Sequence, residues 1–138
     1  MVRAAGIVLA AATAAASNTG PRLHIAGGNA QSATAYASGI SADYWTTFAA
    51  PLRVSTGAVK NVAIRFTCAS RGCTFPPQDQ PDTVNRVDPT SYDVKVVNGT
   101  AEITLTIATA APETVTVLAY PSTARAHAGA VAFTLTAR

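Results

Sequence analysis

Apolar and polar residues alternate with a period of two along much of the chain beyond residue 60. In the segment 101–108, Ile103, Leu105 and Ile107 share one face, while threonines and a glutamate occupy the other. Successive side chains of a β-strand point to opposite sides of its sheet, so this alternation predicts a strand with one buried face. The same pattern is present in the segments 61–68, 114–120 and 130–138.

Turn signals separate these segments. Asn98-Gly99 is the strongest kind of short hairpin signal, and it predicts that the segment 92–97 pairs with the segment 100–107. The segment 76–93 is rich in Pro and Asp, which indicates a long exposed loop. Shorter strands are expected near 23–26, 42–48 and, at a sheet edge, 83–87. No segment has the period of a helix, so the pattern predicts an all-β, two-sheet sandwich.

The composition limits the functions open to the chain. Charged residues make up 12% of its 138 residues, which is about half the average for globular proteins. The formal net charge is +3, but the ten basic residues are scattered along the sequence. Nucleic-acid binding requires a dense basic face that releases counterions, so no nucleic-acid partner is expected.

The first 16 residues have the pattern of a secretory signal peptide. Arg3 precedes about 13 small or apolar residues, and Ala14-Ala15-Ala16 fits a small-residue cleavage site. No segment is long and apolar enough to span a bilayer, so no transmembrane segment is expected. The alternative is that residues 1–16 remain as an ordered N-terminal arm. Residues 17–50, rich in Ala, Gly and Ser, either extend that arm or form the first strands, and residues 51–138 form the sandwich.

Cys68 and Cys73 are the two cysteines of the chain, and Gly72 lies between them. An even pair at this short spacing predicts a small disulfide ring and, with it, an oxidising compartment such as the cell exterior. The alternative is a pair of free thiols, one of which is buried in a strand.

Four segments together resemble the bacterial immunoglobulin-like domains of the invasin and intimin type. In chain order they read PLRVSTG, NVAIRFTC, VVNGTAEITLTIAT and ETVTVLAYPSTARAHAGAVAFTLTAR. The likeness covers residues 51–137 and implies an immunoglobulin-like β-sandwich of about seven to nine strands, here with an irregular N-terminal segment. It also implies a structural or adhesive surface module without catalysis. The Cys68–Cys73 ring is not a general feature of this family.

The sequence contains no motif that could support catalysis. His24 and His127 are the two histidines, and neither accompanies a nucleophile motif. A zinc site would require both histidines to converge on the cysteines, which the spacing does not support. We therefore expect a protein that is not an enzyme and that holds no cofactor.

Tyr44 and Trp45 are the first candidates for binding, because exposed aromatic rings stack on sugars or anchor a protein partner. The alternative is that they, with Tyr36 and Phe48, cover one end of the sandwich or pack into its core. Sandwich loops gather at the two ends of the fold and carry recognition there. Three residues in the expected loops 70–93 and 121–128 are therefore also candidates: Arg71, Arg125 and His127.

The acidic residues of the long loop are candidates for a calcium site. Calcium prefers several carboxylate and carbonyl oxygens supplied by flexible loops, and Asp79, Asp82 and Asp88 lie close together in the sequence. Their spacing fits no EF-hand, and the alternative is an ordinary solvated loop.

Three roles remain open from the sequence. The first is a secreted or surface-displayed bacterial module for adhesion or protein–protein interaction. The second is a structural or decoration subunit on the surface of a virion or in a filament, which docks on assembly neighbours, including copies of itself, through its N-terminal arm. The third is a carbohydrate-binding module that uses Tyr44 and Trp45 on a glycan.

Overall fold

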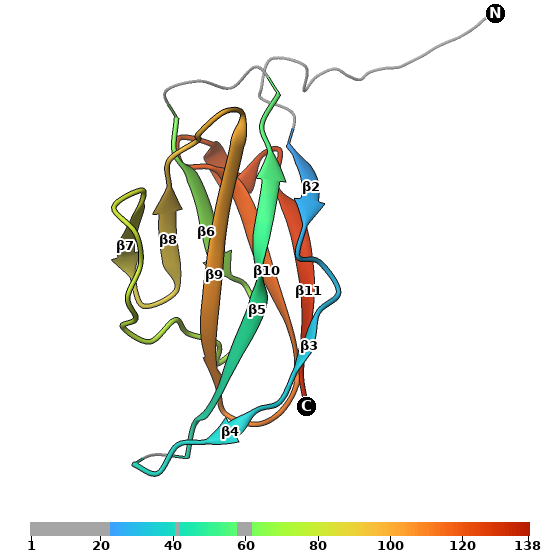
Figure 1. Ribbon diagram of the computed structural model, residues 1–138, viewed down its shortest axis with the longest axis vertical. Coiled ribbons are helices and arrows are strands. Elements are labelled where there is room, and N and C mark those ends of the chain that lie inside the picture. Colours follow the sequence, from blue (N-terminus) through green and yellow to red (C-terminus); the bar gives the residue numbers. More distant parts are fainter. Residues whose placement is uncertain (1–22, 41, 58–61) are drawn as a thin grey trace, which may run out of the picture.

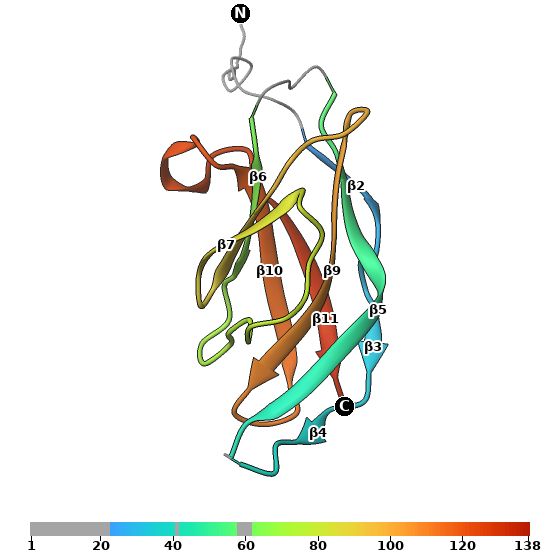
Figure 2. The same cartoon turned by 60° about the vertical axis from the view of Figure 1, so that its left-hand side comes forward.

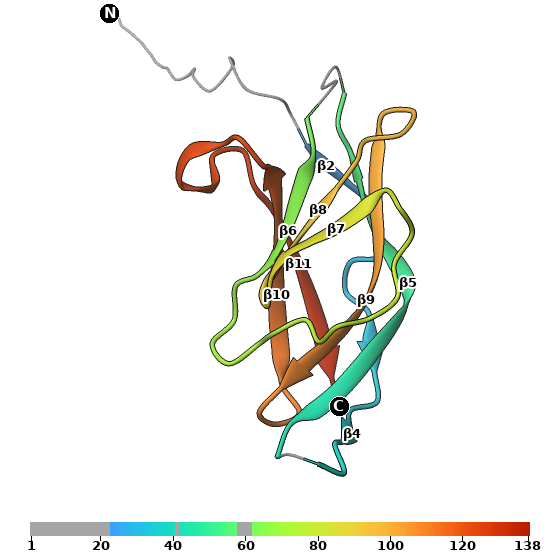
Figure 3. The same ribbon diagram turned by 90° about the vertical axis from the view of Figure 1, so that its left-hand side faces the viewer.

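The computed structural model describes residues 23–40, 42–57 and 62–138. These residues form two β-sheets that pack face to face (Figures 1 and 3), which confirms the predicted all-β sandwich. Residues 1–22, and with them the predicted signal peptide or arm, lie outside the described residues.

The larger sheet has six strands, and the smaller has β5 at its centre. In spatial order the larger sheet contains β3 (Ser32–Ala33), β11 (Val131–Ala137), β10 (Thr114–Pro121), β6 (Ile64–Cys68), β8 (Ser91–Val94) and β7 (Val84–Asp88). In the smaller sheet, β5 (Tyr44–Ser55) pairs with β9 (Thr100–Thr109), β2 (His24–Gly27) and β4 (Tyr36–Ala37). This division, with the last two long strands beside β6 and with β5 beside β9, is the arrangement of an immunoglobulin-like sandwich.

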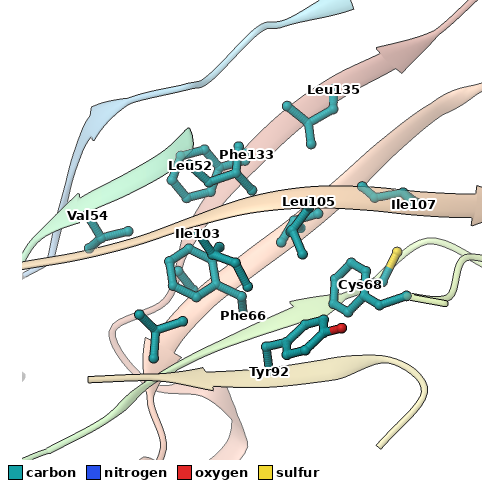
Figure 4. Packing of buried hydrophobic residues seen from close by; sticks show 14 of the residues in the cluster. Leu52, Val54, Phe66, Cys68, Tyr92, Ile103, Leu105, Ile107, Phe133 and Leu135 are labelled. Atoms are coloured by element: carbon teal, nitrogen blue, oxygen red, sulfur yellow. The ribbon is translucent and has the colours of Figure 1, made fainter. Parts of the chain in front are cut away.

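The core lies between the inward faces of the two sheets (Figure 4). Leu52, Ile103 and Leu105 of the smaller sheet are buried against side chains of the larger one. There Phe66 and Phe133 are fully buried, and their ring centroids lie 6.2 Å apart. Apart from Leu52, these are apolar positions of the alternating segments, so in those segments the period of two correctly indicated which face of the strand is buried.

The segment 23–37 changes from one sheet to the other and back. It pairs with β5 as β2, then runs parallel to β11 as β3, and returns to β5 as β4. Side-chain amides hold it between these strands. The amide of Gln31 donates to the C=O of Ala50 and accepts from its N–H, and Asn29 Oδ1 accepts from the N–H of Thr134. Residues 23–37 are thus strands of the sandwich.

The hairpin predicted around Asn98-Gly99 is wrong, although the turn itself is present. Both residues have positive φ (51° and 75°), and Val97 and Thr100 exchange two backbone hydrogen bonds. Beyond this pair the chain separates, because β8 pairs with β6 in one sheet and β9 pairs with β5 in the other. The turn is therefore the crossing between the two sheets.

The long loop expected at 76–93 is only partly exposed. The edge strand expected near 83–87 is present as β7, at the edge of the larger sheet. However, Ser91 and Tyr92 are buried in β8, and Tyr92 packs on buried Phe75 with ring centroids 5.5 Å apart. Burial also raises the pKa of the Tyr92 phenol above its usual value.

Thr46 has a hydroxyl oxygen that is buried without a hydrogen-bond partner among the described residues. A buried polar group without a partner loses its bond to water and gains nothing in return. We expect Thr46→Val, which keeps the shape of the side chain, to raise the free energy of unfolding by about 1 kcal/mol in urea unfolding. Thr47→Val is the control, because the exposed Thr47 hydroxyl is 2.8 Å from that of Thr106 and should give no gain. A loss of stability in Thr46→Val would show that its hydroxyl has a partner.

Candidate functional site: an apolar tip at the turn between β4 and β5

The turn between β4 and β5 carries three exposed apolar side chains. Tyr36 of β4 lies directly opposite Trp45 of β5, so their side chains share one face of the hairpin. Tyr36 is 71% exposed, Trp45 is 48% exposed and Ile40, between the two strands, is 99% exposed. We call these three residues the apolar tip. The turn forms one end of the sandwich in all three ribbon views (Figures 1, 2 and 3).

Small residues and local hydrogen bonds shape this turn. The Ser38 N–H donates to the C=O of Asp43 at 2.7 Å, which closes the hairpin. The Ile40 N–H donates to Ser38 Oγ at 3.2 Å. Ala37 and Gly39 leave room beside the rings, where the tip surrounds a shallow hollow of about 310 Å³. The hollow is open to a ligand or a partner side chain.

The tip concentrates the exposed apolar surface of the described chain. Large apolar side chains are exposed at five positions of the described chain: Tyr36, Ile40, Trp45, Val87 and Val97. Three of the five belong to one turn, whereas isolated exposed apolar residues are ordinary on protein surfaces. Because exposed apolar clusters mark interaction sites more often than single residues do, the tip is the best candidate site.

The residues proposed from the sequence do not form one surface. Tyr44 is half-buried and pairs with Thr109. It directly precedes Trp45 in β5, and because successive side chains of a strand alternate, it lies on the opposite face from Trp45. Arg71 is exposed in the short loop that follows β6. Arg125 and His127 are exposed in a short 3-10 helix after β10. That helix lies at the end of the sandwich opposite the apolar tip (Figure 2).

His127 packs on an aromatic residue of β10. Its ring stacks on Tyr120 with centroids 4.4 Å apart. The Tyr120 hydroxyl lies 2.8 Å from Thr67 Oγ1, which lies 3.0 Å from Ser91 Oγ. The network fastens the loop after β10 to the outer face of the larger sheet.

A salt bridge lies on the same outer face. Arg65 donates two hydrogen bonds to the carboxylate of Asp93, at 2.7 and 3.1 Å. The bond to Asp93 raises the pKa of Arg65 above its usual value. Arg65 and Asp93 are directly opposite each other in β6 and β8. The ion pair therefore links two strands of the sheet, and its two charges already neutralise each other.

The structure does not gather the three aspartates of the proposed calcium site. Among the described residues, no three His, Cys, Asp or Glu side chains come together as metal ligands. Asp88 instead accepts hydrogen bonds from the N–H and hydroxyl of Thr90, at 2.8 and 2.9 Å. The bond from the Thr90 N–H is the main cause of a lowered pKa at Asp88. Its carboxylate therefore closes the β7–β8 turn.

The predicted disulfide is present. Cys68 and Cys73 are bonded, with Cα atoms 5.9 Å apart, and both are buried. The bond ties the end of β6 to the loop that follows. Ser70 Oγ in that loop accepts from the N–H of Thr116 in β10, so the ring is held at the edge of the core.

The sequence did not single out two residues of the tip, Tyr36 and Ile40, or two residues of a loop beside β9. Ile40 carried a signal, because it is a large aliphatic residue in a Ser- and Gly-rich turn flanked by aromatic residues. Gln78 and Gln80 carried none, because their role depends on a strand distant in the sequence. Both donate to backbone C=O groups of β9.

The chain has no match among protein-family models, curated proteins or solved structures. The described residues define an all-β, two-sheet sandwich with a disulfide and an exposed apolar turn. In the described part of the chain, no helix has the length and hydropathy needed to cross a membrane.

Proposed function

We propose that the protein is a non-catalytic, exported or surface-displayed module that binds a protein partner through the apolar tip. The observation that carries the proposal is the exposure of Ile40, Tyr36 and Trp45 on a single turn. Aromatic residues bring large contact area at low entropic cost and are common energetic centres of interfaces. The disulfide supports an oxidising location outside the cytosol.

Ile40 favours a protein partner over a glycan. Its side chain cannot form hydrogen bonds, and full exposure leaves its whole surface available for burial. A sugar offers many hydroxyl groups, which require polar partners when they are buried. Tyr36 and Trp45, which lie opposite each other in the hairpin, support a glycan as the second candidate, because an exposed aromatic ring can stack on a pyranose.

The test compares two charge substitutions at exposed apolar positions, one in the tip and one far from it. Beads that carry the full chain are scored for retention on panels of cells and of immobilised extracellular proteins. We expect Ile40→Asp to weaken retention at least about 30-fold, the loss typical of an interface hot spot. Val97→Asp is the matched control, because Val97 is 53% exposed and lies in the crossing turn at the far end of β9.

Thermal unfolding of both variants checks that the fold is intact. Equal retention of the two variants would contradict the proposal. Changes in the fluorescence of Trp45, the single tryptophan of the chain, then separate the candidates. A change with soluble glycans and none with retained proteins would favour the carbohydrate-binding role.

A further inference from the structure

The free edge of β9 is covered by side chains along only part of its length. Thr74 exchanges two backbone hydrogen bonds with Ala108, at 3.0 and 2.8 Å. The amide of Gln78 donates to the C=O of Thr106 and accepts from its N–H, at 2.9 and 2.8 Å. These bonds imitate those of a neighbouring strand, so they close this half of the edge to further pairing.

The other half of the edge is open. Alternate residues of β9 turn their backbone groups away from β5, as the bonds of Thr106 and Ala108 show. By the same alternation, the N–H and C=O of Glu102 and the N–H of Thr104 also point away from β5. Within the described part of the chain, the N–H and C=O of Glu102 and the N–H of Thr104 have no hydrogen-bond partner there. On this half of the edge, the C=O of Thr104 accepts one exposed hydrogen bond, from Gln80 Nε2 at 2.9 Å.

A groove of about 480 Å³ runs beside these open backbone groups. Ile103 and Leu105, whose side chains point to the core, form part of its floor together with Val84 of β7. Its charged lining residues are the carboxylates Asp79 and Glu102, and Glu102 accepts a hydrogen bond from Arg53 Nε at 3.2 Å. The groove thus has a backbone edge, apolar surface from the half-buried Val84, and the carboxylate of Asp79 beside the Arg53–Glu102 ion pair.

The edge of the larger sheet provides a contrast. β7 is short, has a bulge between Arg86 and Asp88, and carries the charged side chains of these two residues. Such features prevent a further strand from adding to an edge. β9 is longer, but its half at 102–104 carries the charged residue Glu102, and its pairing with β5 is irregular between Ile103 and Leu105.

We infer that the groove along Glu102 and Thr104 is a strand-addition site for an extended peptide segment of a partner protein. The incoming backbone bonds to the open groups of Glu102 and Thr104. Aliphatic residues of the segment face Val84 on the inward side of the groove, and alternate basic residues face Asp79 and compete with Arg53 for Glu102. The site does not include the apolar tip, so either one can exist without the other.

The segment has to displace Gln80, because both compete for the Thr104 C=O. This competition makes the inference testable with a variant that should bind better than the native chain. Gln80 makes no other bond in the groove among the described residues. We therefore expect Gln80→Ala to raise the affinity for the segment about fivefold, the effect of freeing one backbone acceptor.

The experiment is a titration of the ¹⁵N-labelled full chain, followed by amide chemical shifts. The probe is the acetylated and amidated peptide Val-Lys-Val-Lys-Val, and the control peptide has Glu in place of Lys. We expect the Lys peptide to shift the amides of Glu102 and Thr104 and to leave those of Arg86 and Val87 on β7 unchanged. Asp79→Lys should weaken this binding severalfold.

Three results would overturn the inference. The first is the absence of shifts at Glu102 and Thr104 with millimolar Lys peptide in the Gln80→Ala variant. The second is equal binding of the Glu peptide, which would show that the carboxylates of Asp79 and Glu102 play no part. The third is weaker binding by Gln80→Ala, which would show that Gln80 supports the groove and does not compete for it. Loss of tip binding in Ile40→Asp has no bearing on these outcomes.

Discussion

Gly28→Ala should lower the free energy of unfolding by about 3–5 kcal/mol, which is the sum of backbone strain and steric overlap. Gly28 has φ of +86°, in a region that residues with a Cβ rarely adopt. A Cβ built at this position would lie 2.2 Å from the C=O oxygen of Pro51 and 2.8 Å from the Cα of Leu52. Both atoms belong to the backbone of β5, so neither can rotate away.

Gly72→Ala is the matched control for this substitution. Gly72 also has a positive φ, of +75°, but a Cβ there would meet nothing within 4 Å. It should therefore cost only the strain of the backbone, about 1 kcal/mol. Urea unfolding of the two variants, with the disulfide intact, separates strain from overlap. Equal losses would show that β5 does not approach Gly28 closely.

Phe75→Ala should lower the free energy of unfolding by about 3–5 kcal/mol, as expected for removing a buried aromatic ring. Phe75 is fully buried and packs on Tyr92, and its C=O accepts a hydrogen bond from Arg86 at 2.8 Å. Its neighbours in the sequence are polar residues and prolines, and the sequence alone places it at the border of an exposed recognition loop. The substitution therefore tests the packing of that loop.

Val87→Ala is the control, because Val87 follows in the same stretch of chain and is 42% exposed. Exposed positions of this kind change stability by about 0.5 kcal/mol or less. Chemical denaturation of both variants decides between the two descriptions of the loop. If Phe75→Ala lowers the free energy of unfolding no more than Val87→Ala does, then Phe75 is not buried and the segment is an exposed loop.

The sequence determined the strands whose alternation is local. Ile103, Leu105 and Ile107 appear as one apolar face in the printed chain and are one buried face in the sandwich. The disulfide between Cys68 and Cys73 was also predictable, because its partners are neighbours in the sequence. In each case the physical cause acts over a few residues.

For the candidate site, the sequence singled out Trp45 but not the surface to which it belongs. Tyr36 and Ile40 join Trp45 because β4 folds back on β5, and their exposure depends on which faces the remaining strands cover. The sequence grouped Trp45 with Tyr44, Arg71, Arg125 and His127, which the fold distributes over different faces and ends.

Only the tertiary structure decided how the strands pair. Asn98-Gly99 fixes a turn through its positive φ angles, which is a local property, and the turn is present. Whether the chain on either side then pairs with itself depends on which strands compete for its backbone hydrogen bonds. Here β6 takes β8 and β5 takes β9, and Gln78 completes the edge of β9 from a loop 28 residues away. Such pairings bring together residues that are distant in the sequence, and no pattern within one segment encodes them.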